Sequence, residues 1–214
     1  MDAGEAAPGR RCRGASRATG EAGHEMTALM LATEIAKRPV VTLAGEAVAQ
    51  VKDTVFDGPG GRVAGFTLSG GGLFSGPLKR ALPWAGVTGL GSHAVMIRDE
   101  NVFEDRAQVA DRSETGGGNV LGSRVLTDTG TDLGRITDVV IEVNETSATA
   151  VGYAIASSEV LGHHERIVFI PLSQTIAVSG EALVVPALAA EFVAEDLPGF
   201  TEMMQAFRAR LTEA

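Results

Sequence analysis

The sequence has little cysteine and no long apolar run, and each shortage excludes a class of protein. Its 214 residues include a single cysteine, Cys12, which cannot form an intramolecular disulfide and is a poor basis for a metal site. No window approaches the ~20 apolar residues that span a bilayer. The apolar run at residues 28–32 is shorter than the ~7–15 residues of a signal-peptide core. We therefore expect a cytoplasmic protein without membrane insertion.

Basic residues are also scarce. The chain has 18 Lys and Arg residues against 27 Asp and Glu residues, a formal net charge of −9. Because affinity for nucleic acid rests mainly on basic side chains that neutralise phosphates, this charge disfavours nucleic acid as a partner, and it disfavours anionic membranes for the same reason. Aromatic residues reach only 5%, but apolar residues make up 44%, which is a globular composition.

Residues 1–25 differ from the remainder. They are rich in Gly, Ala and Arg and lack hydrophobic periodicity, so they are not expected to form a core. We predict a disordered tail, or a mis-annotated start with Met26 or Met30 as the true first residue. The alternative is an arginine-bearing arm for nucleic acid.

An internal repeat is the most informative feature of the sequence. Six positions recur after 85 residues with the same or a similar side chain: Thr42, Gly45, Val48, Val51, Asp53 and Val55 recur as Thr127, Gly130, Leu133, Ile136, Asp138 and Val140. Further along, Gly65-Phe66 matches Gly152-Tyr153 and Pro83 matches Pro171, at offsets of 87 and 88. Such self-similarity predicts two copies of one structural unit.

Each copy reads as a series of short β-strands. Segments rich in β-branched and aromatic residues alternate with glycine-rich turns, at residues 40–41, 48–56, 63–68, 79–84 and 94–97 of the first copy. The spacing leaves no room for helical crossovers. We predict an all-β protein of two tandem small barrels, at residues 31–103 and 119–195, joined by an acidic, glycine-rich linker at 104–118.

One amphipathic helix is predicted at residues 196–214. Its apolar side chains follow helical spacing, and they are Phe200, Met203, Met204, Phe207 and Leu211. Asp196 is placed to cap its start. The stripe either packs on the protein's own second barrel or binds a partner groove. Together with Leu73 and Phe74, it forms our candidate interaction surface.

Laid out in this way, the repeat resembles the PRC-barrel family. The motifs that carry the resemblance are VTLAG (residues 41–45), VKDTVFD (51–57), GRVAGF (61–66) and LPW (82–84), then VLTDTG (125–130), ITDVVI (136–141) and IPL (170–172). The family includes the cytoplasmic barrel of the photosynthetic reaction centre H subunit and the C-terminal domain of a bacterial ribosome maturation factor. The resemblance implies two tandem PRC-type barrels that act as interaction modules without shared catalytic residues. The chain lacks the membrane helix of the former and the other domain of the latter.

The chain shows no catalytic constellation. The glycine-rich stretch at residues 71–77 has Pro77 near the position where a phosphate-binding loop needs lysine. His163 and His164 are adjacent, so on a strand they would point to opposite faces, and we expect an exposed hairpin loop there. His24 and His93 are expected to be solvated. We therefore assign no catalytic residue, no cofactor and no metal.

Two further groups of polar residues have structural interpretations. Asp53 and Asp138 occupy equivalent repeat positions, and we expect them to bind nearby turn amides rather than to act as paired acid–base catalysts. Lys79 and Arg80, close to Trp84, allow an RNA-stacking patch, but in so acidic a protein we favour packing or an interface for the tryptophan.

These observations favour a non-enzymatic protein-interaction module, an adaptor or assembly factor with an unidentified protein partner and with homodimerisation as an option. The alternative is an RNA- or ribosome-associated maturation factor. An enzyme with an unrecognised site is the least supported hypothesis.

Overall fold

The structure is a computed structural model that describes residues 27–57, 61–70, 76–114, 120–162, 166–172, 177–178 and 181–213. The first half contains β1 (Ala28–Leu31), α1 (Ala32–Ile35), β2 (Pro39–Thr42), β3 (Ala47–Asp57), β4 (Arg62–Ser69), β5 (Pro77–Pro83), β6 (Val87–Leu90), β7 (Val95–Ile97), β8 (Glu104–Asp105) and α2 (Arg106–Glu114). The second half contains β9 (Arg124–Thr127), β10 (Asp132–Val143), β11 (Ala148–Ser157), β12 (Ile167–Pro171), β13 (Ala177–Val178), β14 (Ala182–Val185) and α3 (Leu197–Glu213).

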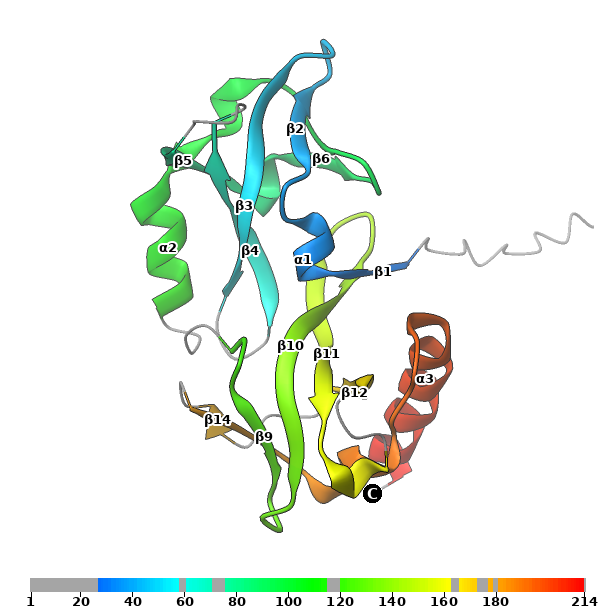
Figure 1. The fold of residues 1–214 in the computed structure, drawn as a ribbon. Coiled ribbons are helices and arrows are strands. Elements are labelled where there is room, and N and C mark those ends of the chain that lie inside the picture. Colours follow the sequence, from blue (N-terminus) through cyan, green and yellow to red (C-terminus); the bar gives the residue numbers. More distant parts are fainter. Residues whose placement is uncertain are drawn as a thin grey trace, which may run out of the picture.

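The described strands pair into one 14-stranded sheet (Figure 1). Its main path runs β13-β14-β9-β10-β11-β4-β3-β2-β7-β6, with β1, β12, β5 and β8 attached beside it. This confirms the prediction of a mostly β protein with a C-terminal helix. We had expected two separate closed barrels. The described pairings do not close either half, because the path of paired strands has two free ends. The sheet instead continues from one half into the other.

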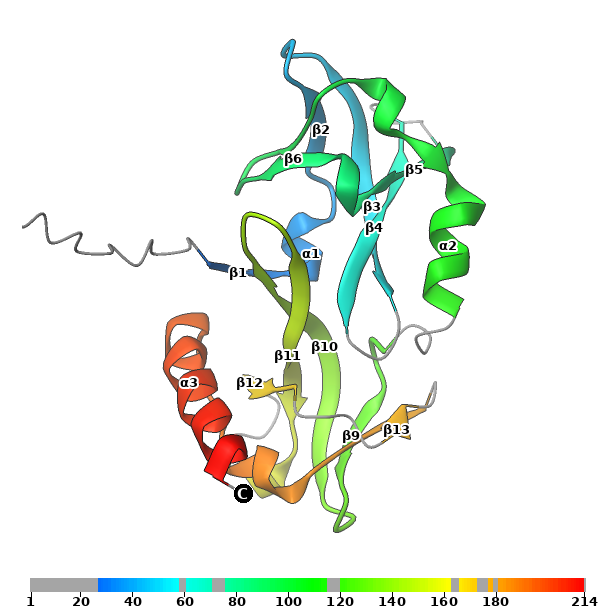
Figure 2. The same ribbon diagram turned by 180° about the vertical axis from the view of Figure 1, so that it is seen from behind.

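The two halves are related by a pseudo-twofold axis. Strands β10, β9 and β14 follow β11 in the same order in which β3, β2 and β7 follow β4. At the junction, β4 and β11 are antiparallel and Arg62 pairs with Thr149. These two residues are repeat equivalents at an offset of 87 (149 − 62), so the axis passes through this pair. Figures 1 and 2 show the consequence: α2 flanks the first half on one side of the molecule, and α3 flanks the second half on the opposite side.

The threonine and glycine of the repeat build the same turn twice. The Thr42 carbonyl accepts from Gly45 N–H at 2.9 Å, and its hydroxyl accepts from Glu46 N–H at 3.2 Å. Thr127 makes the equivalent bonds to Gly130 and Thr131, both at 2.9 Å. The two glycines have φ of +88° and +85°, a conformation that costs residues with a Cβ free energy. Turn chemistry therefore explains why these positions recur.

The repeated glycine-aromatic pair is explained by the neighbouring strand. A Cβ on Gly65 would lie 2.3 Å from the Leu82 carbonyl oxygen, and a Cβ on Gly152 would lie 2.5 Å from that of Ile170. Both contacts are with the backbone of the adjacent strand, β5 or β12, which cannot easily move aside. Any side chain at either position would separate two paired strands.

The halves share one hydrophobic core. Fully buried residues of the first half, such as Phe66 and Ile97, belong to the same cluster as Leu133 and Ile155 of the second half. The only tryptophan lies at the contact between the halves. Trp84 packs against Phe66, with ring centroids 6.2 Å apart, and its indole N–H donates to the Thr146 carbonyl in the β10–β11 turn at 3.1 Å.

We expect the protein to unfold in one cooperative transition, because a shared core leaves neither half with a complete interior of its own. Trp84 emission reports the contact between the halves, while far-UV circular dichroism reports the whole sheet. In a urea titration, both signals should give the same midpoint. A Trp84 transition at lower urea concentration would show that the halves separate before they unfold.

Candidate interaction surfaces

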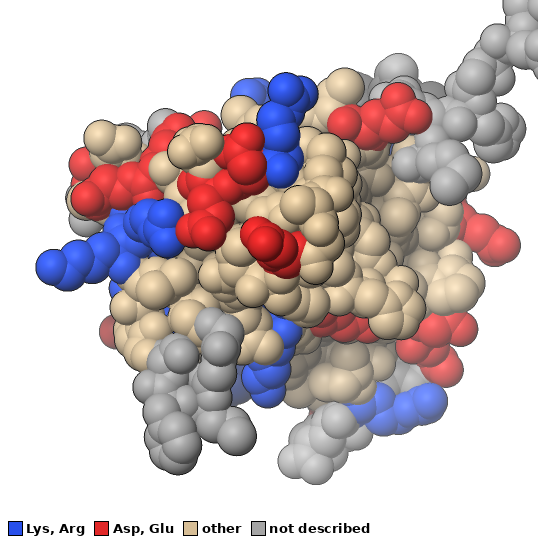
Figure 3. All heavy atoms as spheres, turned by 90° about the horizontal axis from the view of Figure 1, so that it is seen from above, with Lys and Arg blue, Asp and Glu red and all other residues tan. Residues whose placement is uncertain are grey.

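Acidic and basic side chains are mixed on the surface. On the face seen from above, they lie side by side and form no continuous basic patch among the described residues (Figure 3). Several arginines are held in ion pairs with carboxylates: Arg80–Glu100 at 3.1 Å, Arg124–Asp132 at 2.6 Å, Arg166–Glu195 at 3.4 Å and Arg208–Glu142 at 3.3 Å. These pairs take up positive charge that phosphate binding would require.

The predicted Lys79–Arg80–Trp84 patch is divided between different roles. Arg80 pairs with Glu100 and lies 5.1 Å from the centroid of the Phe103 ring. Lys79 lines a shallow groove between β5 and the first turn of α2. Trp84 is engaged at the contact between the halves, which agrees with packing rather than with a stacking platform.

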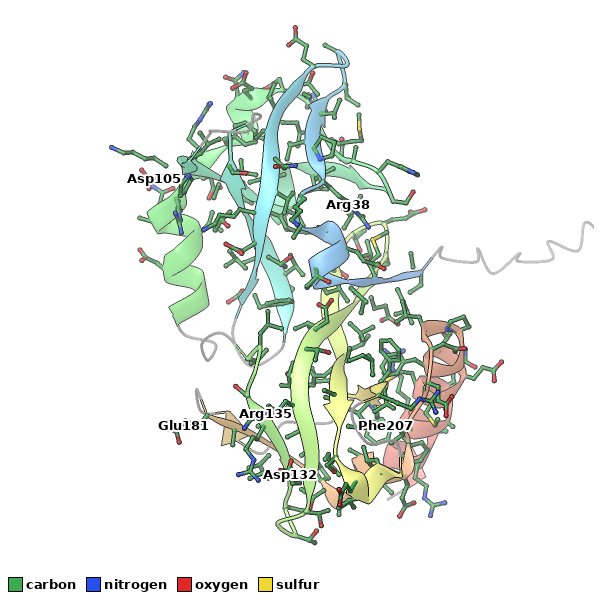
Figure 4. All side chains as sticks on the ribbon, in the orientation of Figure 1. Arg38, Asp105, Asp132, Arg135, Glu181 and Phe207 are labelled. Atoms are coloured by element: carbon green, nitrogen blue, oxygen red, sulfur yellow. The ribbon has the colours of Figure 1, made fainter. Side chains whose placement is uncertain are left out.

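The C-terminal helix packs on the protein itself. In α3, Phe200, Met204 and Phe207 are 0%, 7% and 1% exposed, so they do not form an exposed interaction surface. Figure 4 shows Phe207 between the helix and the rest of the second half. The Phe200 ring lies 6.2 Å from that of Phe169, and Phe207 meets Phe192 edge-on at 5.2 Å. We had left open whether the apolar face of this helix packs on the second half or binds a partner. In the structure its described residues pack on the second half.

Local chemistry explains why the helix starts and sits there. The Asp196 carboxylate accepts from Gly199 N–H at 2.7 Å, which caps the first turn as predicted. Above β11, a Cβ on Gly152 would lie 2.4 Å from the Phe200 ring, so the glycine makes space for that ring. Of the remaining predicted residues, Met203 is partly buried against the same cluster, whereas the Leu211 side chain and all of Leu73 and Phe74 lie outside the described residues.

The expected linker contains the first half's counterpart of α3. Residues 104–114 of the predicted acidic, glycine-rich linker form β8 and α2. Asp105 caps α2 by accepting from Ala107 N–H at 2.8 Å, as Asp196 caps α3. The fully buried Val109 then packs on Val55 and Ala81, whose repeat equivalents Val140 and Phe169 pack beneath Phe200. Residues 115–118 of the predicted linker lie outside the described residues.

Asp53 and Asp138 have different partners in spite of their equivalence. Asp138 is 5% exposed and accepts from Thr33 N–H at 3.2 Å, from the Thr33 hydroxyl and from Val139 N–H at 2.7 Å. It thereby caps α1 from the opposite half of the chain. Asp53 is largely exposed and accepts from the Thr67 hydroxyl at 3.2 Å. Asp138 therefore has a structural role, and the partners of both carboxylates lie mostly outside the turns that we had expected.

Two buried ionisable residues were not singled out from the sequence. Arg38 is 9% exposed and donates to the Gly91 carbonyl at 2.6 Å, which ties the segment after α1 to the β6–β7 turn. Burial lowers the pKa of Arg38, and the nearby Glu34 opposes that shift. Burial raises the pKa of Tyr153 to about 12.

The raised pKa of Tyr153 predicts a loss of stability at alkaline pH. Because folding favours the neutral phenol, its contribution is constant below the ordinary pKa of 10.0 and is lost as the pH rises towards about 12. At pH 12 we expect a loss of about 2 kcal/mol from this group. Tyr153 is the only tyrosine, so phenolate absorbance measures its pKa directly. A titration midpoint near 10 in the folded protein would contradict the burial argument.

The exposed large apolar side chains differ from those we predicted. Leu43, Val160, Ile167 and Leu121 are 65%, 66%, 47% and 44% exposed. Leu43 lies at the tip of the β2–β3 turn, where the second half has Asp128 at the equivalent position. A leucine in one copy where the other copy has an aspartate indicates an exposed position. A comparison of the two copies could therefore have identified Leu43 as an exposed apolar residue.

The described residues show neither a metal-binding cluster nor a membrane-spanning helix. The described residues contain no group of three His, Cys, Asp or Glu that could hold a metal ion. His93 bonds to the Ser92 hydroxyl at 2.7 Å, while His24, His163 and His164 lie outside the described residues. None of the helices in the described part of the chain is long and apolar enough to cross a bilayer.

Comparison with known proteins places both repeats in one family. Residues 29–115 and 113–192 each match the sequence profile of the PRC-barrel domain. Comparison with the curated proteins gives no significant match. The two profile matches cover both halves of the sheet and include α2.

Proposed function

Since this chain belongs to the PRC-barrel family, we propose that it is a non-catalytic protein-interaction module, an adaptor or assembly factor that acts in the cytoplasm. The observation that carries the proposal is the contrast between buried polar and exposed apolar residues. Asp138 and Arg38 are buried and hold the fold together, whereas Leu43 and Val160 remain about two-thirds exposed. A partner that covers either side chain would remove its apolar surface from water, which favours association.

An RNA- or ribosome-associated factor is the second candidate, and the relationship to a ribosome maturation factor favours it. The net charge of −9 and the paired arginines oppose it. Ribonuclease sensitivity separates the two candidates, because an RNA-mediated association depends on intact RNA.

Affinity capture with the full chain tests the proposal. Leu43→Asp introduces the residue that the second half carries at the equivalent position, so the turn is expected to tolerate it. Ala44→Asp, at the next exposed position of the same turn, adds the same charge while it removes only a methyl group, and it serves as the matched control. We expect protein partners that survive ribonuclease and are depleted by Leu43→Asp but not by Ala44→Asp.

Three outcomes would count against the proposal. Capture of ribosomal proteins that disappear with ribonuclease would favour the RNA-associated alternative. A small metabolite that raises the melting temperature and is turned over would favour an enzyme. Equal capture by the wild type and both variants would exclude Leu43 from the binding surface. Sedimentation of the wild type tests the homodimer separately.

A further inference from the structure

The second half contains a docked strand that the first half lacks. Strand β1 lies antiparallel along β10, from Leu31 opposite Val140 to Ala28 opposite Val143. Its Leu29 and Leu31 side chains pack into the cluster beneath α3. Directly after the strand, Thr33 donates from its N–H and its hydroxyl to Asp138. An extended apolar strand followed by a hydroxyl side chain thus occupies this edge of β10.

The equivalent edge of β3 has no such strand. Residues 55–57 correspond to residues 140–142 at the offset of 85. On one side, β3 pairs with β4 along this whole stretch, while on the other side β2 reaches only Ala47, Ala49 and Gln50. Among the described residues, no strand pairs with the second side of residues 55–57. Free N–H and C=O groups on a strand edge are a template for another strand.

Side chains at the β3 edge are also more exposed than their equivalents at the β10 edge, which β1 covers. Ile141 is fully buried, whereas its equivalent Phe56 is only partly buried. Asp138 is 5% exposed, whereas the Asp53 side chain is 62% exposed. The contacts of the Asp53 carboxylate, to Lys52 and to the Thr67 hydroxyl, both involve Oδ2. Its Oδ1 has no partner among the described residues and is therefore available to a donor.

The chain's own sequence supplies no second copy of β1. Residues 28–33 read ALMLAT, and the residues 85 positions later, 113–118, read SETGGG. The second segment carries no apolar side chain with which to cover Phe56. The outer cluster at this edge also has smaller side chains, since Ala64, Ala81 and Val109 stand where the second half has Val151, Phe169 and Phe200, while Val55 matches Val140.

We propose that the edge of β3 at residues 55–57 binds an extended segment of a partner protein by strand addition. By analogy with β1–α1, the segment carries apolar side chains at alternate positions and a Ser or Thr two residues after the last of them, which donates to Asp53. The backbone bonds supply affinity and the alternate side chains supply specificity. This inference rests on the proposed interaction function and names the class of partner.

A peptide of residues 27–35 (TALMLATEI) is the probe, because this sequence is seen in place on β10. It is titrated into the full-length protein, and amide exchange is followed by NMR. We expect saturable binding, slower exchange at residues 55–57 and unchanged exchange at residues 140–143. Asp53→Ala in the protein, or Thr33→Val in the peptide, should each weaken binding about tenfold, the effect of losing one hydrogen bond to a charged group. Because both changes remove the same hydrogen bond, the double change should weaken binding little more than either single change.

Four results would overturn the inference. These are no binding at millimolar peptide, protection only at residues 140–143, slow exchange at residues 55–57 in the free monomer, and protection of residues 55–57 that grows with protein concentration without peptide. The last result would make a second copy of the chain the occupant. The Thr33→Val peptide leaves the protein unchanged, so its result does not depend on how a variant folds. If the peptide fails while ribonuclease-resistant partners still respond to Leu43→Asp, the interaction function stands and only this site is rejected.

Discussion

Replacing Phe200 with alanine is expected to lower the free energy of unfolding by about 3–5 kcal/mol, the usual loss for a fully buried phenylalanine. The side chain is 0% exposed and lies against Phe169 and the backbone of Gly152. The glycine cannot fill the space left by the ring, and the adjacent β12 backbone is held in the sheet. A cavity would therefore remain, and its cost adds to the loss of apolar burial.

Urea unfolding of the full chain measures this effect. Gln205→Ala is the matched control, because Gln205 is an exposed position on the same helix and its replacement should change the free energy by less than about 0.5 kcal/mol. If Phe200→Ala cost less than about 1 kcal/mol, α3 would not be part of the cooperative fold. The same reasoning makes α3 unsuitable for deletion as a test of partner binding.

Replacing Asp138 with alanine is expected to cost about 2–4 kcal/mol, because hydrogen bonds to a buried charged group are among the stronger ones and their loss leaves donors unsatisfied. Thr33 N–H and hydroxyl and Val139 N–H all lose their acceptor. The bonds to Thr33 also connect the start of α1 to the other half of the chain. Loss of these bonds should release β1 and α1 as well as lower the overall stability.

The repeat supplies the control for this experiment. Asp53→Ala removes the equivalent carboxylate from a largely exposed position, and we expect a change of about 0.5 kcal/mol or less. Amide exchange in β1 should accelerate in Asp138→Ala and remain unchanged in Asp53→Ala. Equal destabilisation by the two substitutions would mean that the two carboxylates have the same role.

The features that could be predicted from the sequence are those whose causes are local. Gly45 and Gly130 recur because one turn needs a positive φ, and the strands follow from β-branched segments between such turns. A duplicated unit repeats these local requirements at a fixed offset. The family, the strands and the C-terminal helix were accessible for this reason.

The features that could not be predicted depend on contacts distant in the sequence. The continuity of the sheet depends on Arg62 meeting Thr149, and Asp138 finds Thr33 across 105 positions. Neither contact leaves a pattern in a single chain. The helix at α2 was missed because its composition is mostly polar, and Val109 is the one buried residue among its described side chains. Asp105 before α2 was a capping signal equal to Asp196 before α3.

The pseudo-twofold axis has a consequence for how such a molecule can evolve. In a symmetric homodimer every substitution appears on both subunits at once, so both copies of a surface must change together. Fusion of the two units into one chain removes that restriction. Leu43 faces solvent where its counterpart Asp128 accepts from Ala187 N–H, and Trp84 stands where the other half has Leu172. One half is thus free to acquire a new specificity while the other preserves the scaffold.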